Sequence, residues 1–128
     1  ISPYLSGKEL RAVAFAGPAS NLILALLAGL AIRYFPFFNQ NTYDAVGYFL
    51  IINISLAVFN MIPIAPLDGS QIFGSMLPPE IAMKLQIYGP QVLLGLILFG
   101  IITDHSIIWL IMKPAVSFFV YLFSGINI

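Results

Sequence analysis

Long apolar runs separated by short polar connections extend over most of the chain. Three of these runs have about the 20 mostly apolar residues that a helix needs to cross a bilayer. They cover residues 12–32, 45–63 and 85–103. A fourth run, residues 106–126, is apolar but is interrupted by Lys113 and Pro114, so it predicts one kinked span or two half-helices. The pattern therefore predicts an all-α, polytopic membrane bundle of three to four transmembrane helices, in a single domain over residues 1–128.

The second run ends in an irregular, proline-rich segment. Pro63 and Pro66 cannot both continue a regular helix, because proline lacks the backbone donor and crowds the preceding turn. Such helix breaks are tolerated at membrane depth only where protein or water forms hydrogen bonds with the released backbone groups. We therefore predict a broken helix or loop here, at a sheltered place. Further along, Pro78, Pro79 and Glu80 predict the start of the next helix.

Asp68 directly follows this break. The residues before it, 45–67, include no Lys, Arg, Asp or Glu. An ionisable side chain within a membrane costs about 2.5–3.5 kcal/mol on insertion scales, which makes it a functional candidate. Leu67-Asp68-Gly69 is also good turn chemistry, so a structural role as a helix cap or turn is the alternative.

The composition supports a membrane location. Hydrophobic residues make up 60% of the chain and charged residues 8%, against roughly 25% charged in soluble domains. These charges are too few to cover a water-facing surface, so we expect an integral, multi-pass protein in contact with the lipid bilayer. A net charge of zero without a basic run gives no indication of nucleic-acid binding. The absence of cysteine excludes disulfides, thiolate catalysis and cysteine-bound metals.

Basic residues indicate an orientation. If the three clear spans alternate, Lys8, Arg11 and Lys84 lie on one side of the membrane and Arg33 lies on the other. The positive-inside rule then places the Asp68 motif toward the cytoplasm.

Several polar side chains interrupt or flank the spans. Asn21 follows Gly17 by one turn, and such an amide can link helices by hydrogen bonds or take part in chemistry. Asn53 and Asn60 are seven residues apart and share one helix face; we interpret Asn53 as structural. His105 is interpreted as a solvated turn residue on the side opposite Asp68.

Lys113 is interpreted as an interfacial lysine whose ammonium group extends toward the membrane surface.

Two motifs in order resemble a known family. Gly17-Pro-Ala-Ser-Asn21 resembles a Gly-x-x-x-Asn element, and residues 60–69 resemble an Asn-x-x-Pro…Leu-Asp-Gly motif. Together they are similar to the site-2 protease family of intramembrane zinc metalloproteases, above all to compact bacterial members without an inserted PDZ domain. The likeness extends over the whole chain and implies a bacterial cytoplasmic membrane.

The resemblance implies roles for individual residues. Asp68 would be the third ligand of one zinc ion, which lowers the pKa of its bound water to about 7 and polarises the scissile carbonyl. Asn21 and Asn60 would position the substrate or stabilise the developing oxyanion. Gly69 would let the backbone turn close to the metal. One departure from the family is Ala65, where members often carry proline.

The larger departure is that the chain contains no His-Glu-x-x-His, the segment that would supply two zinc ligands and the general base. Catalytic zinc normally takes three protein ligands. Because the sequence also begins at Ile1 rather than Met, we expect it to be the C-terminal portion of a longer peptidase that cleaves transmembrane segments of membrane proteins. The alternatives are a catalytically inactive homologue acting as a membrane scaffold, and a small transporter subunit with a polar path along Asp68 and the asparagines.

Overall fold

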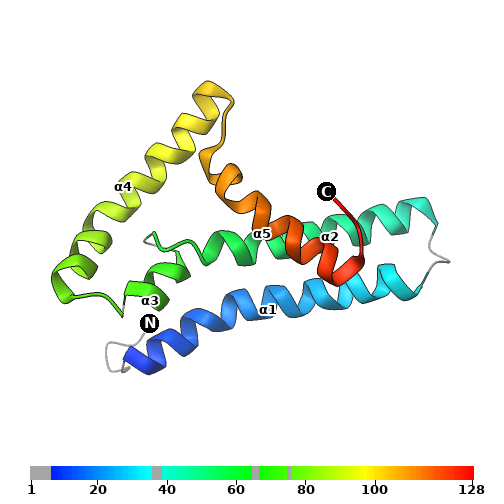
Figure 1. Cartoon of the computed structure of the whole chain (residues 1–128), viewed down its shortest axis with the longest axis horizontal. Coiled ribbons are helices and arrows are strands. Elements are labelled where there is room, and N and C mark those ends of the chain that lie inside the picture. Colours follow the sequence, from blue (N-terminus) through cyan, green and yellow to red (C-terminus); the bar gives the residue numbers. More distant parts are fainter. Residues whose placement is uncertain (1–6, 36–38, 65–66, 75) are drawn as a thin grey trace.

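The computed structural model describes residues 7–35, 39–64, 67–74 and 76–128, and every regular element in them is a helix. In chain order the helices are α1 (Gly7–Tyr34), α2 (Gln40–Asn60), α3 (Asp68–Gly74), α4 (Pro79–Thr103) and α5 (Ile107–Ser124) (Figure 1). The all-α prediction is confirmed.

Four of the described helices are long and apolar enough to cross a membrane, judged by their length and composition. The candidate spans are Ala12–Tyr34, Gln40–Asn60, Pro79–Thr103 and Ile107–Ser124. The structure thus supports an integral membrane protein.

Proline determines several details of the two C-terminal helices. Pro79 opens α4, where its missing N–H costs no hydrogen bond, as the sequence predicted. Pro90 lies inside α4. Pro114 lies inside α5, which is one continuous helix rather than two half-helices.

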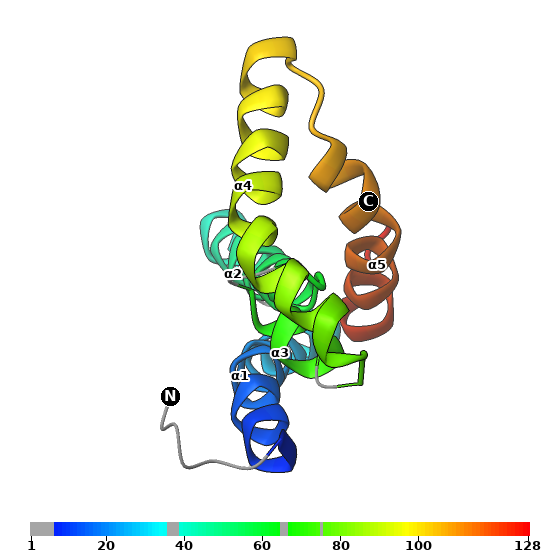
Figure 2. The ribbon, with the colours of Figure 1, turned by 90° about the vertical axis from the view of Figure 1, so that its left-hand side faces the viewer.

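The helices form a compact group of three with a fourth that leans away. α1 and α2 lie side by side in opposite directions, and α5 crosses over them (Figures 1 and 2). α4 packs mainly against α3 and α5, and of its described residues only Gly89 and Leu93 are buried. In a membrane, most of the α4 surface would therefore contact lipid or another protein segment.

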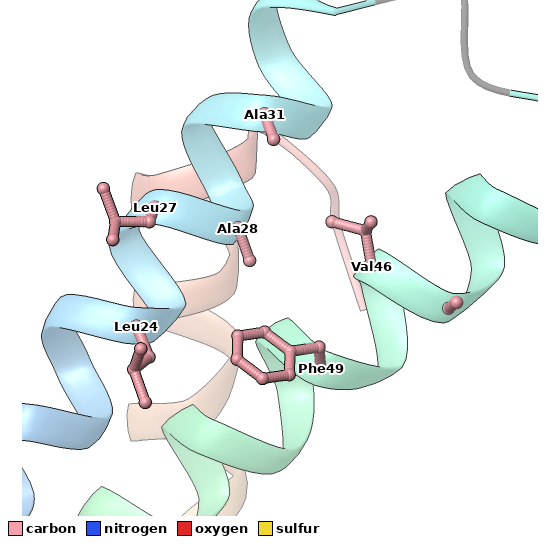
Figure 3. Close-up of a pocket in the computed structure, with 7 residues that line it drawn as sticks. Leu24, Leu27, Ala28, Ala31, Val46 and Phe49 are labelled. Atoms are coloured by element: carbon pink, nitrogen blue, oxygen red, sulfur yellow. The ribbon is translucent and has the colours of Figure 1, made fainter.

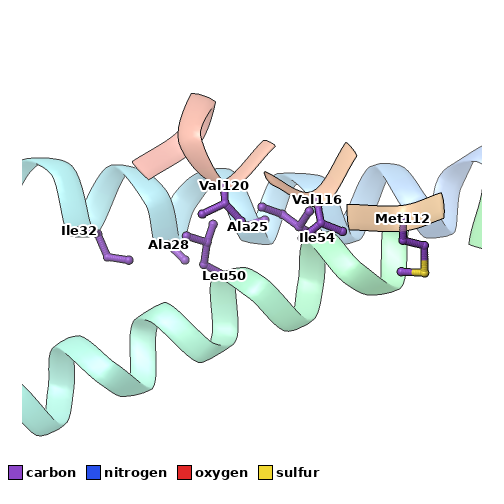
Figure 4. Close-up of a cluster of buried hydrophobic side chains, with 8 residues drawn as sticks. All are labelled: Ala25, Ala28, Ile32, Leu50, Ile54, Met112, Val116 and Val120. Atoms are coloured by element: carbon purple, nitrogen blue, oxygen red, sulfur yellow. The ribbon is translucent and has the colours of Figure 1, made fainter. Parts of the chain in front are cut away.

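The core lies where α5 covers the groove between α1 and α2. Each helix contributes apolar residues three or four positions apart, which places them on one face. The buried cluster consists of Ala25, Ala28, Ile32, Leu50, Ile54, Met112, Val116 and Val120 (Figure 4). The alanines of α1 keep its surface flat, so that α5 can approach closely.

Arg33 joins the last turn of α1 to the last turn of α5. Its Nη2 donates hydrogen bonds to the carbonyl oxygens of Leu122 at 3.1 Å and Tyr121 at 3.4 Å. A cation at a helix C-terminus is favourable because the unpaired carbonyls carry partial negative charge. Gly125, with φ of 80°, ends α5 beside the Arg33 side chain. The two helices therefore run in the same direction, whereas simple alternation of four spans would make α5 antiparallel to α1.

Gly29 allows a close contact between α1 and α5. A Cβ atom at this position would come within 2.7 Å of the Phe123 backbone and Cβ. We expect Gly29→Ala to lower the free energy of unfolding by about 1–3 kcal/mol, as overpacking does. Thermal unfolding of the intact protein in detergent, followed by circular dichroism, measures this change.

Gly95→Ala is the matched control, because nothing lies within 4 Å of a Cβ at that position in α4. This variant should be unchanged or more stable by up to about 1 kcal/mol, since alanine favours helix. Equal unfolding temperatures for the two variants would contradict the close packing of α5 on Gly29.

Candidate functional site

The helix break predicted before Asp68 is present. α2 ends at Asn60, and the chain continues through turns in which the Ile64 N–H bonds to the Ile62 carbonyl at 2.8 Å. The Leu67 N–H then bonds to the Ile64 carbonyl at 2.9 Å, and α3 begins at the next residue. Pro63 is exposed in this segment. Ala65 and Pro66 lie outside the described residues, so the predictions made for them are not tested.

Asp68 is the first residue of α3, and its carboxylate reaches α1 at Gly17. A Cβ atom on Gly17 would lie 3.2 Å from Asp68 Oδ2, so the absence of a side chain there makes room for the carboxylate. The Asp68 side chain is half-buried, and within the described part of the chain it has no hydrogen-bond or ion-pair partner. The two sequence motifs, one on α1 and one before α3, therefore meet at these two residues.

Gly69 fixes the position of α3 against the end of α2. A side chain at Gly69 would overlap the carbonyl oxygens of Met61 and Ile62. The buried Ser70 hydroxyl donates to the Leu67 carbonyl oxygen at 2.7 Å, which holds the first turn of α3. The structure shows that Gly69 lets α3 approach the residues just after α2. Its suggested role beside a metal stays a prediction.

The asparagines differ in their surroundings. Asn21 is half-buried and lies four residues after Gly17 on the same face of α1. Its side chain has no hydrogen-bond partner among the described residues. Asn60 is also half-buried, and its Nδ2 donates to the Leu56 carbonyl at 3.0 Å within its own helix. The roles predicted for both in binding a substrate stay predictions. Asn53 is buried and donates to the Phe49 carbonyl at 2.8 Å, a bond within α2.

The other polar candidates lie away from Asp68. His105 is exposed in the turn after α4. This turn is separated from α3 by the 25 residues of α4, a helix about 37 Å long (Figure 1). Lys113 is exposed on α5.

The described residues do not by themselves fit a catalytic zinc ion. Among them, no group of three or more His, Asp or Glu side chains is close enough to hold a metal. A catalytic site normally uses three protein ligands and keeps one position for water. Asp68 offers a single carboxylate, a suitable zinc ligand, so further ligands would have to come from elsewhere.

Two of the apolar cavities between the described helices are lined by α1. The larger, about 490 Å³, is lined by α1 and α2 toward their loop, and includes Ala31 and Phe49 (Figure 3). The second, about 360 Å³, lies between α1, α2 and α5 and includes Pro18, the neighbour of Gly17. No sequence motif marks the α5 residues of the second cavity, so sequence reasoning did not find it.

Comparisons with known proteins agree with the family resemblance. The sequence model of peptidase family M50 matches residues 36–100. YwhC of Bacillus subtilis (strain 168), named as an inferred zinc metalloprotease, is 28% identical over 125 residues, which are 89% of this chain and 56% of YwhC. Zinc metalloprotease MJ0392 of Methanocaldococcus jannaschii is 30% identical over 121 residues, 88% of this chain and 33% of that protein.

The chain thus spans about half the length of YwhC and a third of MJ0392. No solved structure matches the chain.

Proposed function

Because the chain belongs to peptidase family M50, the site-2 protease family, we propose that it is part of a membrane-embedded zinc endopeptidase and supplies one aspartate ligand to the zinc. The observation that carries the proposal is the contact between Gly17 on α1 and the Asp68 carboxylate on α3. This contact unites the two motifs at a half-buried carboxylate with no partner among the described residues.

In this proposal Asp68 is one of three protein ligands. The other two, with the general base, would be His-Glu-x-x-His side chains from outside these 128 residues, since the sequence contains a single histidine. Both relatives are longer than the matched region, which leaves room for such a segment. Asn21, on the same α1 face as Gly17, would donate its amide N–H groups to the carbonyl oxygen under attack.

The proposed substrate is a transmembrane segment of another membrane protein. Its helix has to unwind locally at the cleavage site, because a helical backbone keeps its carbonyl groups in intrahelical hydrogen bonds. The break between α2 and α3 provides irregular backbone beside Asp68 at which an unwound segment could form hydrogen bonds.

For the location, we propose a bacterial cytoplasmic membrane with the Asp68 motif toward the cytoplasm. Lys84 is exposed near the start of α4, soon after α3, and so adds positive charge on the Asp68 side. Arg33 lies at the opposite end of α1, where it is bonded to the carbonyls of α5. The positive-inside rule favours this orientation.

Removing zinc tests the proposal. We expect the intact protein, reconstituted in lipid vesicles with a single-span model substrate, to stop cleaving when 1,10-phenanthroline removes the metal. Addition of zinc should restore cleavage, because the aspartate and histidine ligands can bind the metal again. The readout is the amount of cleaved substrate on a gel, with the non-chelating 1,7-phenanthroline isomer as control.

Cleavage that continues in the chelator would contradict the proposal. A protein that folds, binds no zinc and cleaves nothing would favour an inactive membrane scaffold instead.

A further inference from the structure

The cavity between α1, α2 and α5 has apolar walls on all three sides. It has a volume of about 360 Å³. Among its lining residues are Phe15, Pro18 and Leu22 of α1, Ala57 of α2, Met61 directly after α2, and Ala115 of α5. The α1 residues lie three and four positions apart, so they form one face of that helix.

Residues adjacent to both sequence motifs line this cavity. Pro18 directly follows Gly17, whose Cα lies against the Asp68 carboxylate. Met61 directly follows Asn60, and its carbonyl oxygen lies against Gly69. The cavity therefore lies next to the candidate site.

Resting on the proposed function, we propose that this cavity is a substrate subsite that receives one large apolar side chain, such as Phe or Leu, from a residue close to the scissile bond. An unwound substrate segment is extended, and successive side chains of an extended segment point to opposite sides. A segment whose backbone lies beside Asp68 would direct one of these side chains toward Pro18 and Met61.

The polar groups of the candidate site next to the cavity favour a peptide over a lipid chain as its occupant. Asn21 and Asn60 directly precede the lining residues Leu22 and Met61 in the chain. The Asp68 carboxylate lies against Gly17, which precedes the lining residue Pro18. A peptide has backbone N–H and C=O groups that can pair with such groups, and a lipid tail has none. Since the side chain leaves a lipid environment that is already apolar, its preference for the cavity would come from close packing.

Filling the cavity from α5 tests the proposal. Ala115 is partly buried and lines the cavity, so Ala115→Phe would occupy the space of the substrate side chain. The intact protein in lipid vesicles is given single-span substrates that carry Ala, Leu or Phe at each residue flanking the cleavage site, and products are quantified by mass spectrometry. At one flanking position, the wild type should prefer Phe or Leu to Ala by about 10-fold or more in kcat/KM.

Ala115→Phe should abolish or reverse this preference while the Ala substrate is still cleaved. The matched control is Ala31→Phe, which fills the other cavity, about 21 Å further along α1 from Gly17. Ala31 is also partly buried, and this variant should keep the wild-type preference.

A second variant enlarges the cavity. Phe15 is 50% exposed, so Phe15→Ala removes part of one wall with little loss of core packing. It should shift the preference at the same position toward Trp by about 10-fold. If Ala115→Phe cleaves none of the three substrates, Phe15→Ala provides the test. A shift of its preference toward Trp supports the subsite, and an unchanged preference overturns it.

An unchanged preference in both variants would show that the cavity serves packing or lipid. The proposed function fails by a different result, namely cleavage that does not depend on Asp68. If cleavage requires Asp68 but both variants keep the wild-type side-chain preference, the subsite is overturned and the proposed function is retained.

Discussion

Replacing Asp68 with Asn in the intact protein is expected to abolish cleavage of a transmembrane substrate and to weaken zinc binding. The amide has nearly the shape of the carboxylate, so the contact with Gly17 should be retained while the negative charge is lost. Loss of an outer-shell partner alone typically costs 10–100-fold in metal affinity or activity. We therefore expect a loss of more than about 100-fold for a direct ligand, measured by cleavage in lipid vesicles and by the zinc content of the purified protein.

Asp44→Asn is the matched control. Asp44 is exposed at the start of α2 and accepts a hydrogen bond from Gln40 Nε2 at 2.8 Å, a bond that asparagine can also accept. This variant should cleave and bind zinc as the wild type does. Undiminished cleavage by Asp68→Asn would remove Asp68 from the zinc site and with it the central residue of the proposed function.

The second large effect is expected from Gly69→Ala, although alanine is usually the mildest replacement in a helix. The added Cβ would overlap the carbonyl oxygens of Met61 and Ile62, which belong to backbone and cannot turn aside as a flexible side chain can. α3 would have to shift, and Asp68 would shift with it. We expect the free energy of unfolding to fall by about 1–3 kcal/mol and cleavage to fall by about 100-fold, since a displacement of 1 Å can cost that much.

Gly74→Ala provides the control at the other end of the same short helix. Nothing lies within 4 Å of a Cβ at Gly74, so this variant should keep wild-type cleavage and thermal stability. If Gly69→Ala and Gly74→Ala behave alike in both measurements, the close contact between α3 and the end of α2 does not position Asp68.

The helices themselves were predictable from the sequence because the bilayer requires a length and a composition that few other structures share. The break before Asp68 and the helix start at Pro79 were predictable because proline acts on the local backbone, whatever the tertiary structure. The effect of Pro114 could not be predicted in the same way. The sequence left open whether it divides the last span, and packing against α1 and α2 keeps α5 continuous.

The site was predictable only in part. The family resemblance singled out Asp68, but neither spacing nor composition shows that its carboxylate lies against Gly17, because that contact depends on how α3 packs on α1. The cavity was not predictable at all. Ala115 is an ordinary apolar position in the sequence, and it lines a cavity only because α5 runs in the same direction as α1.

The bond between Arg33 and α5 also has a consequence for how the protein is made. Its acceptors, the carbonyls of Tyr121 and Leu122, follow 88 and 89 residues later in the chain. At about 5–20 residues per second, a ribosome reaches them roughly 4 to 18 seconds after Arg33. Met112, Val116 and Val120 of the core arrive in the same late segment. During that interval the groove between α1 and α2 is not covered by α5, so a helix translated much later than α1 and α2 completes the core.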